Sequence, residues 1–406
     1  MKLLKTIGIV ASLFALSATP RARADVVLDW NMIVTELPIA PPVMARVLAT
    51  MHGAMHDAIN SIDPRYQPYR FPVTAPQGAS KEAAAAAAAH GVLVSLVPAQ
   101  KANFDTALTT SLAKVQDGQP KTDGIAVGKE VAGKMVAWRS ADGFAAKAAD
   151  KPGTAAGAWQ RTPPAMAPGI LPQLGAVTPF VLKSADQFPA KARPVLSSAD
   201  FARDYNEVKR LGGRNSTERT AEQTAVAFFW VGNEVPVWSA AARTASTAKG
   251  LSIDENARLF ALMHMAAADA GIAAFKIKYG SSYWRPITAI RNGAAAGNGA
   301  ITADANWEPL LVTPPHPEFP SAHCILSGAY AQVLRDFFQS DEIKFTYVYP
   351  PVLGLMRTYA SFSQIAKEVE DARVFSGIHF RSTDEESTEL GRKIGAYAMA
   401  SSMRPR

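Results

Sequence analysis

The sequence is poor in cysteine and has little excess charge. Cys324 is the single cysteine among 406 residues, so no intramolecular disulfide can form and stability must come from a buried core. The formal net charge is +7, but the first 24 residues hold four basic side chains and no acidic one, which leaves +3. This balance argues against a nucleic-acid-binding protein, which would concentrate basic residues in a stripe. Any functional cations must therefore be local.

Long apolar runs are also missing, except at the start of the chain. Lys2 and Lys5 precede the run IGIVASLFALSA, which is too short to span a bilayer, and Ala22-Arg23-Ala24 has the small-x-small pattern of a cleavage site. We expect residues 1–24 to be a signal peptide that is cleaved after Ala24. The mature protein is then exported to the periplasm or the extracellular space, without stable membrane insertion.

Alternating strand patterns are few, and amphipathic helical patterns dominate. Apolar residues recur at steps of three and four in PPVMARVLATMHGAMHDAINSID, and KEAAAAAAAHGVLVSLV predicts a second helix. Further helices are expected over residues 101–115, 124–139, 199–211 and 217–230. Residues 254–279 are apolar on most sides, which predicts a buried central helix. The fold class is therefore all-α.

The composition divides the chain into two helical regions. Residues 141–198 are rich in Pro, Gly and Ala without a clear period, which predicts a long ordered loop that lines a pocket or a subunit contact. This loop belongs to an N-terminal helical region, residues 25–245. The C-terminal helical bundle, residues 246–406, carries the candidate site. We predict that the two bundles pack together, with the site at one end of the second.

Three short stretches of the C-terminal region share cations, histidines and small hydrogen-bonding groups. They are KYGSSYWRP (278–286), PSAH (320–323) and ARVFSGIH (372–379). Each alone is weak, because a lysine with a nearby arginine is usually a solvated face and PSAH is most often a helix start. We expect Ser321 to cap a helix over 322–338, with His323 in its first turn. A helix N-terminus is itself a favourable anion site.

The three cations of these stretches indicate a compact, multiply charged oxyanion. Guanidinium groups of Arg285 and Arg373 match oxyanion oxygens in pairs, while Lys278 supplies a point charge. Phosphate and vanadate both fit this description. Because Arg285 precedes Pro286, helix is disfavoured there, and the chain can turn the Lys278 and Arg285 head groups toward one site.

The order Lys-x6-Arg-Pro, Pro-Ser-x-His and Arg-x5-His resembles the superfamily of vanadium-dependent haloperoxidases and type-2 phosphatidic acid phosphatases. Lys278, Arg285-Pro286, Pro320-Ser321-Ala322-His323 and Arg373 with His379 keep these spacings. VVLDWNMIVTE and the helical segment after it are similar to exported bacterial haloperoxidase-like members. The resemblance implies a fold of two packed helical bundles.

The resemblance also implies roles for these residues. The three cations would neutralise one vanadate per chain, and Ser321 with the backbone N–H of Ala322 would hydrogen-bond its oxygens. His379 would be the protein ligand of vanadium, and His323 the acid–base group. The implied reaction is oxidation of a halide by hydrogen peroxide to hypohalous acid, which reacts with a small organic acceptor. Relatives suggest a homo-oligomer.

The chain departs from the family pattern at three positions. Ala322 replaces a glycine, Ala372 replaces a serine before the arginine, and Thr383 stands where the family has an aspartate four residues after the ligand histidine. Asp384, one position later, and Asp269, on the predicted central helix, are candidates for orienting residues of the site.

His316 lies seven positions before His323. Bromide-oxidising members of the family place a histidine there and chloride-oxidising members an aromatic residue, which favours bromide or iodide. The alternative is an exposed loop residue in TPPHPEF.

The same residues allow two other functions. In a soluble exported acid phosphatase, His379 would be the nucleophile and His323 would protonate the leaving alcohol. In a non-catalytic helical scaffold, the anion pocket would remain without turnover.

Other potentially reactive residues have a simpler interpretation. His52 and His56, at i and i+4, are expected to pack between helices rather than bind a metal. His90 and His264 are expected to be core histidines, and Cys324 a buried thiol.

Overall fold

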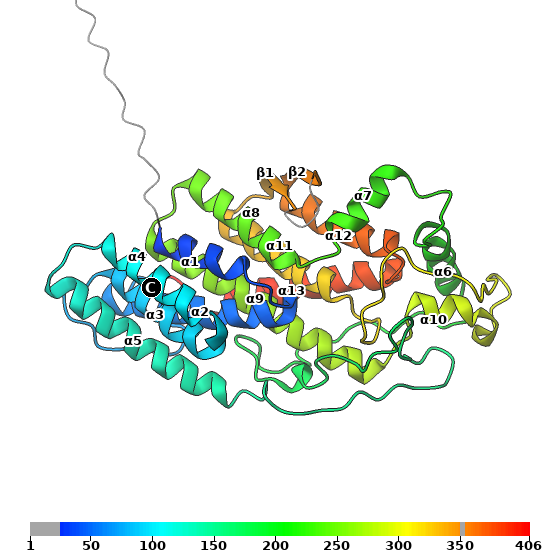
Figure 1. Ribbon diagram of the computed structural model, residues 1–406, viewed down its shortest axis with the longest axis horizontal. Helices are drawn as coiled ribbons and strands as arrows, with labels where there is room; N and C mark the ends of the chain where they lie inside the picture. Colours follow the sequence, from blue (N-terminus) through cyan, green and yellow to red (C-terminus); the bar gives the residue numbers. More distant parts are fainter. Residues whose placement is uncertain (1–24, 350–353) are drawn as a thin grey trace, which may run out of the picture.

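The computed structural model describes residues 25–349 and 354–406, and the expected signal peptide lies outside these ranges. The described chain is mostly helical, which confirms the all-α class, with one two-stranded sheet. Figure 1 shows an elongated arrangement of packed helices. The elements are α1 (Val26–Thr35), α2 (Pro41–Ile62), α3 (Lys81–Leu96), α4 (Lys101–Ala113), α5 (Gln119–Ser140), α6 (Ala199–Leu211), α7 (Ala221–Phe229), α8 (Glu234–Lys249), α9 (Ile253–Ser281), α10 (Pro286–Arg291), α11 (Ala322–Phe338), β1 (Glu342–Val348), β2 (Met356–Ser361), α12 (Phe362–Phe375) and α13 (Arg381–Ser401).

Helix α9 is the central helix of the molecule. It begins with a capping box, in which Ser252 accepts from the backbone N–H of Glu255 and the Glu255 side chain accepts from that of Ser252. The helix is long and apolar enough to cross a membrane, but 89% of its most apolar window is buried inside the protein. It packs against α2 on one side and α11 and α13 on the other. The predicted buried helix over 254–279 is therefore confirmed.

Helices α11 and α13 run parallel and in close contact. The backbone N–H of Ser321, at the start of α11, donates to Ser387 Oγ (2.9 Å). Further along, a Cβ at Gly391 would lie 2.0 Å from the Ile325 carbonyl oxygen, so only glycine permits this approach. Both helices therefore begin at the same end of the bundle, with the start of α11 level with Ser387 in the second turn of α13.

The segment between α5 and α6, residues 141–198, runs along one long side of the molecule (Figure 1). Apart from a 3-10 turn at Leu174–Ala176, it has no helix or strand. Its anchor is the buried carboxylate of Asp269 on α9, which accepts the backbone N–H groups of Phe180, Val181 and Leu182 at 2.6–2.8 Å. A loop this long keeps one conformation because its backbone donors are satisfied in this way.

The antiparallel sheet of β1 and β2 was absent from the sequence expectation. Phe345 pairs with Tyr359 and Val348 with Met356, and an irregularity follows Glu342. Phe345 and Tyr359 are buried on the inner face, while alternate residues of β1 are exposed. The sheet packs on α8 and α12, near the top of Figure 1.

One hydrophobic core cluster runs from α1 to α13 through both predicted regions. The last residues of the chain return to the first bundle, where Pro405 pairs with Tyr66 and the Arg406 N–H donates to the Arg65 carbonyl. The proposed boundary between residues 245 and 246 stays a prediction.

Candidate oxyanion site

The three motifs lie together at the common start of α11 and α13. Lys278 is in the last turn of α9, Arg285 directly precedes α10, and Arg373 is in the last turn of α12. Ser321 precedes α11, and His379 lies in the turn between α12 and α13. Each of these five side chains is at most 3% exposed. Among the described residues, none of the three cations forms a salt bridge with a carboxylate, and their hydrogen-bond partners are backbone carbonyls and histidine rings. This makes the site a buried anion-binding environment.

Arg285 connects three segments of the site. Its Nε donates to the carbonyl of His316 (2.9 Å), and its Nη1 donates to the carbonyl of Ile378 (2.8 Å). The same Nη1 lies 3.0 Å from His379 Nε2. Burial lowers the pKa of Arg285 to about 9, which still leaves it protonated at neutral pH. As predicted, the helix ends before Arg285, which has extended backbone angles and turns inward.

Lys278 and Arg373 are held by backbone carbonyls. Lys278 Nζ donates to the carbonyls of Pro317 (2.8 Å) and Glu318 (3.1 Å), and Arg373 Nη1 donates to that of Trp230 (2.7 Å). Burial lowers the pKa of Lys278 well below its usual range, and the nearby Arg285 lowers it further. An anion bound here would raise the pKa of Lys278 again, because it gives each cation a partner of opposite charge.

Ser321 occupies the N-cap position, but its hydroxyl makes no capping hydrogen bond, so that expectation was wrong. Instead Ser321 Oγ is fully buried without a hydrogen-bond partner among the described residues, and so is Arg373 Nε. Unsatisfied buried polar atoms are rare and require an explanation. The first-turn N–H groups of α11, beginning at Ala322, also lack intrahelical partners. These donors fit an oxyanion such as vanadate or phosphate.

His379 has one nitrogen for an anion and one for the protein. Arginine can only donate, so the Nε2 that faces Arg285 is the acceptor nitrogen and Nδ1 carries the proton. His379 Nδ1 lies 3.0 Å from Oε1 of Glu318, a fully buried carboxylate. Burial lowers the pKa of His379 well below its usual range, and Arg285 and Lys278 lower it further, so the ring is neutral. A neutral imidazole with its Nε2 lone pair among three cations suits a ligand or a nucleophile.

The residue that orients His379 is Glu318, which sequence reasoning missed. Of the two predicted candidates, Asp269 anchors the 141–198 segment instead. Asp384 Oδ1 accepts from Cys324 Sγ (3.3 Å), and its Oδ2 has no partner in the described part of the chain. Burial raises the pKa of Asp384 well above its usual range, and Glu318 raises it further. Neither aspartate hydrogen-bonds a site cation or His379.

The His323 side chain is 17% exposed, more than those of Lys278, Arg285, Ser321, Arg373 and His379. Its Nε2 donates to the carbonyl of Gly232 (2.9 Å) and lies 3.4 Å from Oε2 of Glu234, the first residue of α8. Burial and Arg373 lower the pKa of His323 well below its usual range. Burial raises the pKa of Glu234 to about 7. An imidazole and a carboxyl group this close together can exchange a proton.

His316 is buried, so its interpretation as an exposed loop residue was wrong. Arg285 Nη2 donates to His316 Nδ1 (3.0 Å), and the ring packs on Phe275 with centroids 5.5 Å apart. His316 therefore contacts Arg285, one of the three cations of the oxyanion site.

The remaining histidines and the cysteine lie outside the motifs. His52 and His264 stack in the core and both contact Asn31 Nδ2 at 3.0–3.1 Å. His90 is only partly buried and pairs with Asp105 (2.8 Å), so its core assignment was wrong. Cys324 is buried as expected. Among the described residues, no group of three or more His, Cys, Asp or Glu side chains can hold a metal cation.

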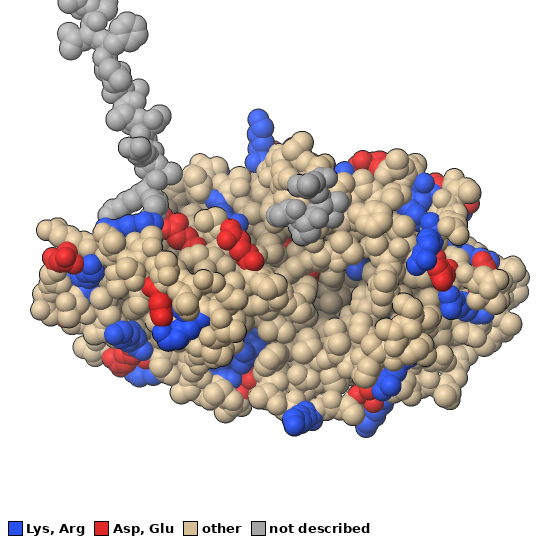
Figure 2. Space-filling view, viewed as in Figure 1, with Lys and Arg blue, Asp and Glu red and all other residues tan. Residues whose placement is uncertain are grey.

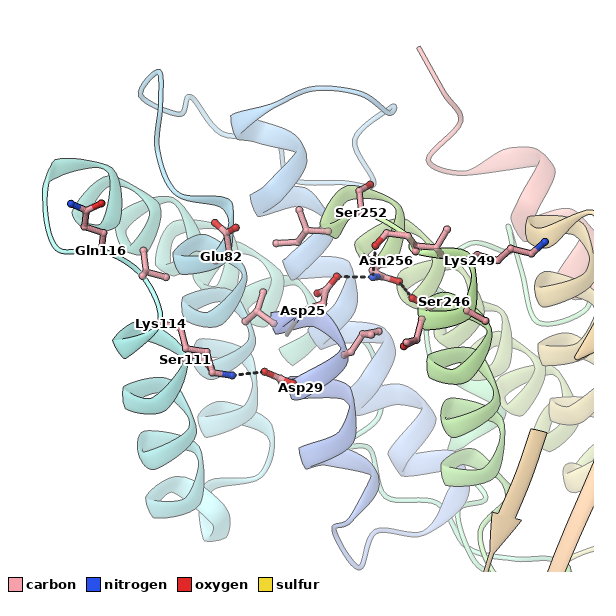
Figure 3. Close-up of a pocket in the computed structure, with 18 residues that line it drawn as sticks. Asp25, Asp29, Glu82, Ser111, Lys114, Gln116, Ser246, Lys249, Ser252 and Asn256 are labelled. Carbon is pink, nitrogen blue, oxygen red and sulfur yellow. Dashed lines mark hydrogen bonds and ion pairs between the residues drawn. The ribbon is translucent and has the colours of Figure 1, made fainter. Parts of the chain in front are cut away.

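A separate cavity of about 1100 Å³ lies between the ends of α1, α4, α8 and α9 (Figure 3). Its polar groups pair with one another: Lys114 bonds Asp29 (2.9 Å), and Asn256 bonds Asp25 (2.6 Å). None of the motif residues lines it. Figure 2 shows that charged side chains lie mainly toward the two ends of the visible face, around a hollow near its middle.

Comparisons with known proteins agree with this geometry. The profile of the VCPO second helical-bundle domain matches residues 258–405. Vanadium chloroperoxidase from Curvularia inaequalis is 28% identical over 196 residues, and the match covers 41% of this chain but only 32% of that protein. The chain thus spans about a third of the length of this curated relative.

Solved structures extend the likeness over almost the whole chain. A bacterial vanadium-dependent iodoperoxidase superposes with a TM-score of 0.79 and 26% identity, covering 94% of this chain and 96% of its own. A holo-type bacterial vanadium-dependent chloroperoxidase shares the fold with a TM-score of 0.74 and 18% identity, covering 91% and 96%. The profile match over residues 258–405 and the fold shared with the iodoperoxidase support placing this chain in the superfamily of the vanadium-dependent haloperoxidases.

Proposed function

We propose that the protein is a vanadate-dependent haloperoxidase that uses hydrogen peroxide to oxidise a halide to hypohalous acid. The observation that carries this proposal is the neutral His379 Nε2 among three buried cations, beside the unpartnered hydroxyl of Ser321. The named activities of the structural matches support the same conclusion. The predicted signal peptide adds a second proposal, export from the cytoplasm.

The residues of the site divide into holding and proton-transferring groups. Lys278, Arg285 and Arg373 offset the negative charge of vanadate, and the Ser321 hydroxyl with the N–H of Ala322 donates to its oxygens. His379 Nε2 offers its lone pair to the metal. Bound vanadate supplies a Lewis acid that activates hydrogen peroxide.

Proton movement in this proposal belongs to His323. Its side chain is more exposed than those of Lys278, Arg285, Ser321, Arg373 and His379, so peroxide and water reach it more easily. Glu234 lies next to it, and burial raises the pKa of Glu234 to about 7, close to neutral pH. A proton taken from peroxide by His323 can therefore be held at His323 or Glu234 and returned to the departing hypohalite oxygen.

Bromide or iodide is the proposed halide. The position of His316 in the sequence suggested this preference. Its ring accepts a hydrogen bond from Arg285, and in its neutral form it adds no positive charge to the site. Burial lowers the pKa of His316 well below its usual range, with Lys278 and Arg285 adding to the effect. The iodoperoxidase among the structural matches agrees with this choice. A small organic acceptor and a homo-oligomeric assembly belong to the same proposal.

A histidine phosphatase is the second candidate, and one observation favours it. The His379 Nε2 lone pair faces the site cations while Nδ1 is fixed by a carboxylate, which is the arrangement of a nucleophile. His323 would protonate the leaving alcohol. A non-catalytic scaffold would keep the anion pocket with neither activity.

The test compares three readouts on the same preparation. Bromide- and iodide-dependent halogenation of a dye with hydrogen peroxide is measured before and after orthovanadate is added, alongside hydrolysis of a chromogenic phosphate ester. Halogenation that needs vanadate and disappears in His379→Ala, but not in the remote control His90→Ala, supports the haloperoxidase. Ester hydrolysis inhibited by vanadate, without halogenation, replaces it by the phosphatase. Oxyanion binding without either activity supports the non-catalytic scaffold.

A further inference from the structure

Glu318 accepts three hydrogen bonds from the segment that carries His379. Its Oε1 accepts from His379 Nδ1 and from the Phe380 N–H, both at 3.0 Å, and its Oε2 accepts from Thr383 Oγ1 at 2.9 Å. The carboxylate is fully buried. Both oxygens of this carboxylate are therefore occupied as acceptors of hydrogen bonds from one segment.

Thr383 connects this carboxylate to a more distant cation. A hydroxyl has one proton, and Thr383 directs it at Glu318, so its oxygen accepts elsewhere. The donor is Arg193 Nη1, at 3.0 Å. Arg193, Thr383, Glu318 and His379 thus form a continuous series of hydrogen bonds in which each donor and acceptor has a defined direction.

Arg193 comes from the long segment between α5 and α6. Its guanidinium carbon lies 3.4 Å from the ring centroid of Phe319, the residue next to Glu318. Two residues earlier, the backbone N–H of Lys191 donates to Glu386 on α13 (3.0 Å). The guanidinium is therefore positioned by stacking on Phe319 and by the backbone hydrogen bond of Lys191, two residues earlier. It contacts both the loop of Glu318 and the helix of Thr383.

We propose that Arg193 and Thr383 are positioning residues of the oxyanion site, acting through Glu318. They fix His379 as the Nδ1–H tautomer, so that its Nε2 lone pair faces the anion. The inference rests on the proposed oxyanion-binding function but does not depend on whether the bound anion is turned over by peroxidase or phosphatase chemistry.

This series of contacts accounts for the departure at position 383. A threonine hydroxyl does not present the negative charge that a carboxylate offers to His379, but it can donate to a carboxylate supplied by another segment, here Glu318. Partners of this kind typically change ligand affinity by about 10–100-fold when they are removed. The 141–198 segment, through Arg193, then contributes to anion affinity although it supplies no direct contact to His379.

The test uses three substitutions and two readouts that need no turnover. Thr383→Val removes the hydroxyl at nearly constant shape, Thr383→Ser retains it, and Arg193→Met retains the length of the stem. Lys191→Met is the matched control, because its side chain is exposed on the same segment and its ion pair is with Glu386, not with Thr383 or Glu318. The affinities for orthovanadate and for inorganic phosphate are measured by calorimetry, and the His379 tautomer by nitrogen NMR of protein with labelled histidine.

We expect Thr383→Val and Arg193→Met to weaken binding of both anions about tenfold and to populate the Nε2–H tautomer of His379. Thr383→Ser and Lys191→Met should keep the wild-type values. Wild-type affinity and an unchanged spectrum in Thr383→Val would overturn the proposal, as would an Nε2–H tautomer in the wild type. If the dye and ester assays show no activity while these shifts occur, the proposed function fails and the positioning role stands.

Discussion

Replacing Glu234 by glutamine should stabilise the protein, and increasingly so as the pH rises. Both carboxylate oxygens of Glu234 are buried without a hydrogen-bond partner among the described residues. The titratable side chain of His323 on α11 lies 3.4 Å away, and the charge of Arg373 on α12 opposes the shift. Burial nevertheless raises the pKa of Glu234 from 4.5 to about 7. Ionising this group in the folded protein therefore costs free energy.

The magnitude follows from the shift. The folded protein holds a proton on Glu234 between pH 4.5 and about 7, whereas the unfolded chain releases it over that window. The free energy of unfolding therefore falls as the pH rises through the window and is constant above it. The shift of about 2.5 pKa units corresponds to roughly 3 kcal/mol, at 1.36 kcal/mol per unit.

Glu234→Gln keeps the shape of the protonated side chain and cannot ionise. We expect the variant to match the wild type near pH 4.5 and to exceed it by about 3 kcal/mol at pH 8. Urea unfolding at pH 4.5, 6, 7 and 8, without phosphate or vanadate, measures the difference. Glu385→Gln, an exposed glutamate on α13, is the control and should show no trend. A stability difference that does not change with pH would refute the reasoning.

Three further perturbations test the site and its support. Oxyanion affinity should rise as the pH falls, because bound negative charge raises the depressed pKa of His323 and binding takes up a proton. Calorimetry in two buffers measures this proton uptake, and uptake that persists in His323→Ala would show that His323 is not its source. Ser321→Ala should weaken phosphate binding about tenfold with little change in urea stability, because its hydroxyl has no partner in the described chain; a large loss of stability would instead show a structural role. Asp269→Asn should cost about 2 kcal/mol of unfolding free energy and speed proteolysis within residues 141–198, because three backbone donors lose a charged acceptor; unchanged cleavage would count against that anchor.

Helices with a clear apolar period were predictable from the sequence. The range 199–211 agrees with α6, and the helix expected after Ser321 agrees with α11. Helix α13 gave no such signal, because the face it buries near the site is polar: Thr383, Asp384 and Ser387 are all buried. A helix that lines an ionic site loses the apolar stripe on which prediction depends.

The site itself was predictable only in part. The spacing of the motifs selected Lys278, Arg285, Ser321 and His379, which the fold brings together. Glu318 gave no signal, because a glutamate between prolines indicates an exposed loop, and its partner His379 is 61 positions away. The absence of a carboxylate at position 383 was the available clue, since an orienting acid was then required from another segment.

The turn between α7 and α8 lies outside the C-terminal bundle, yet it contributes hydrogen-bond acceptors to the site. Arg373 and His323 both donate to carbonyls of this turn, those of Trp230 and Gly232. A fragment that begins at residue 246 would keep the three motifs yet leave both side chains without these acceptors. These two hydrogen bonds thus form only when the turn between α7 and α8 packs on the C-terminal helices, so a shorter unit would lose them.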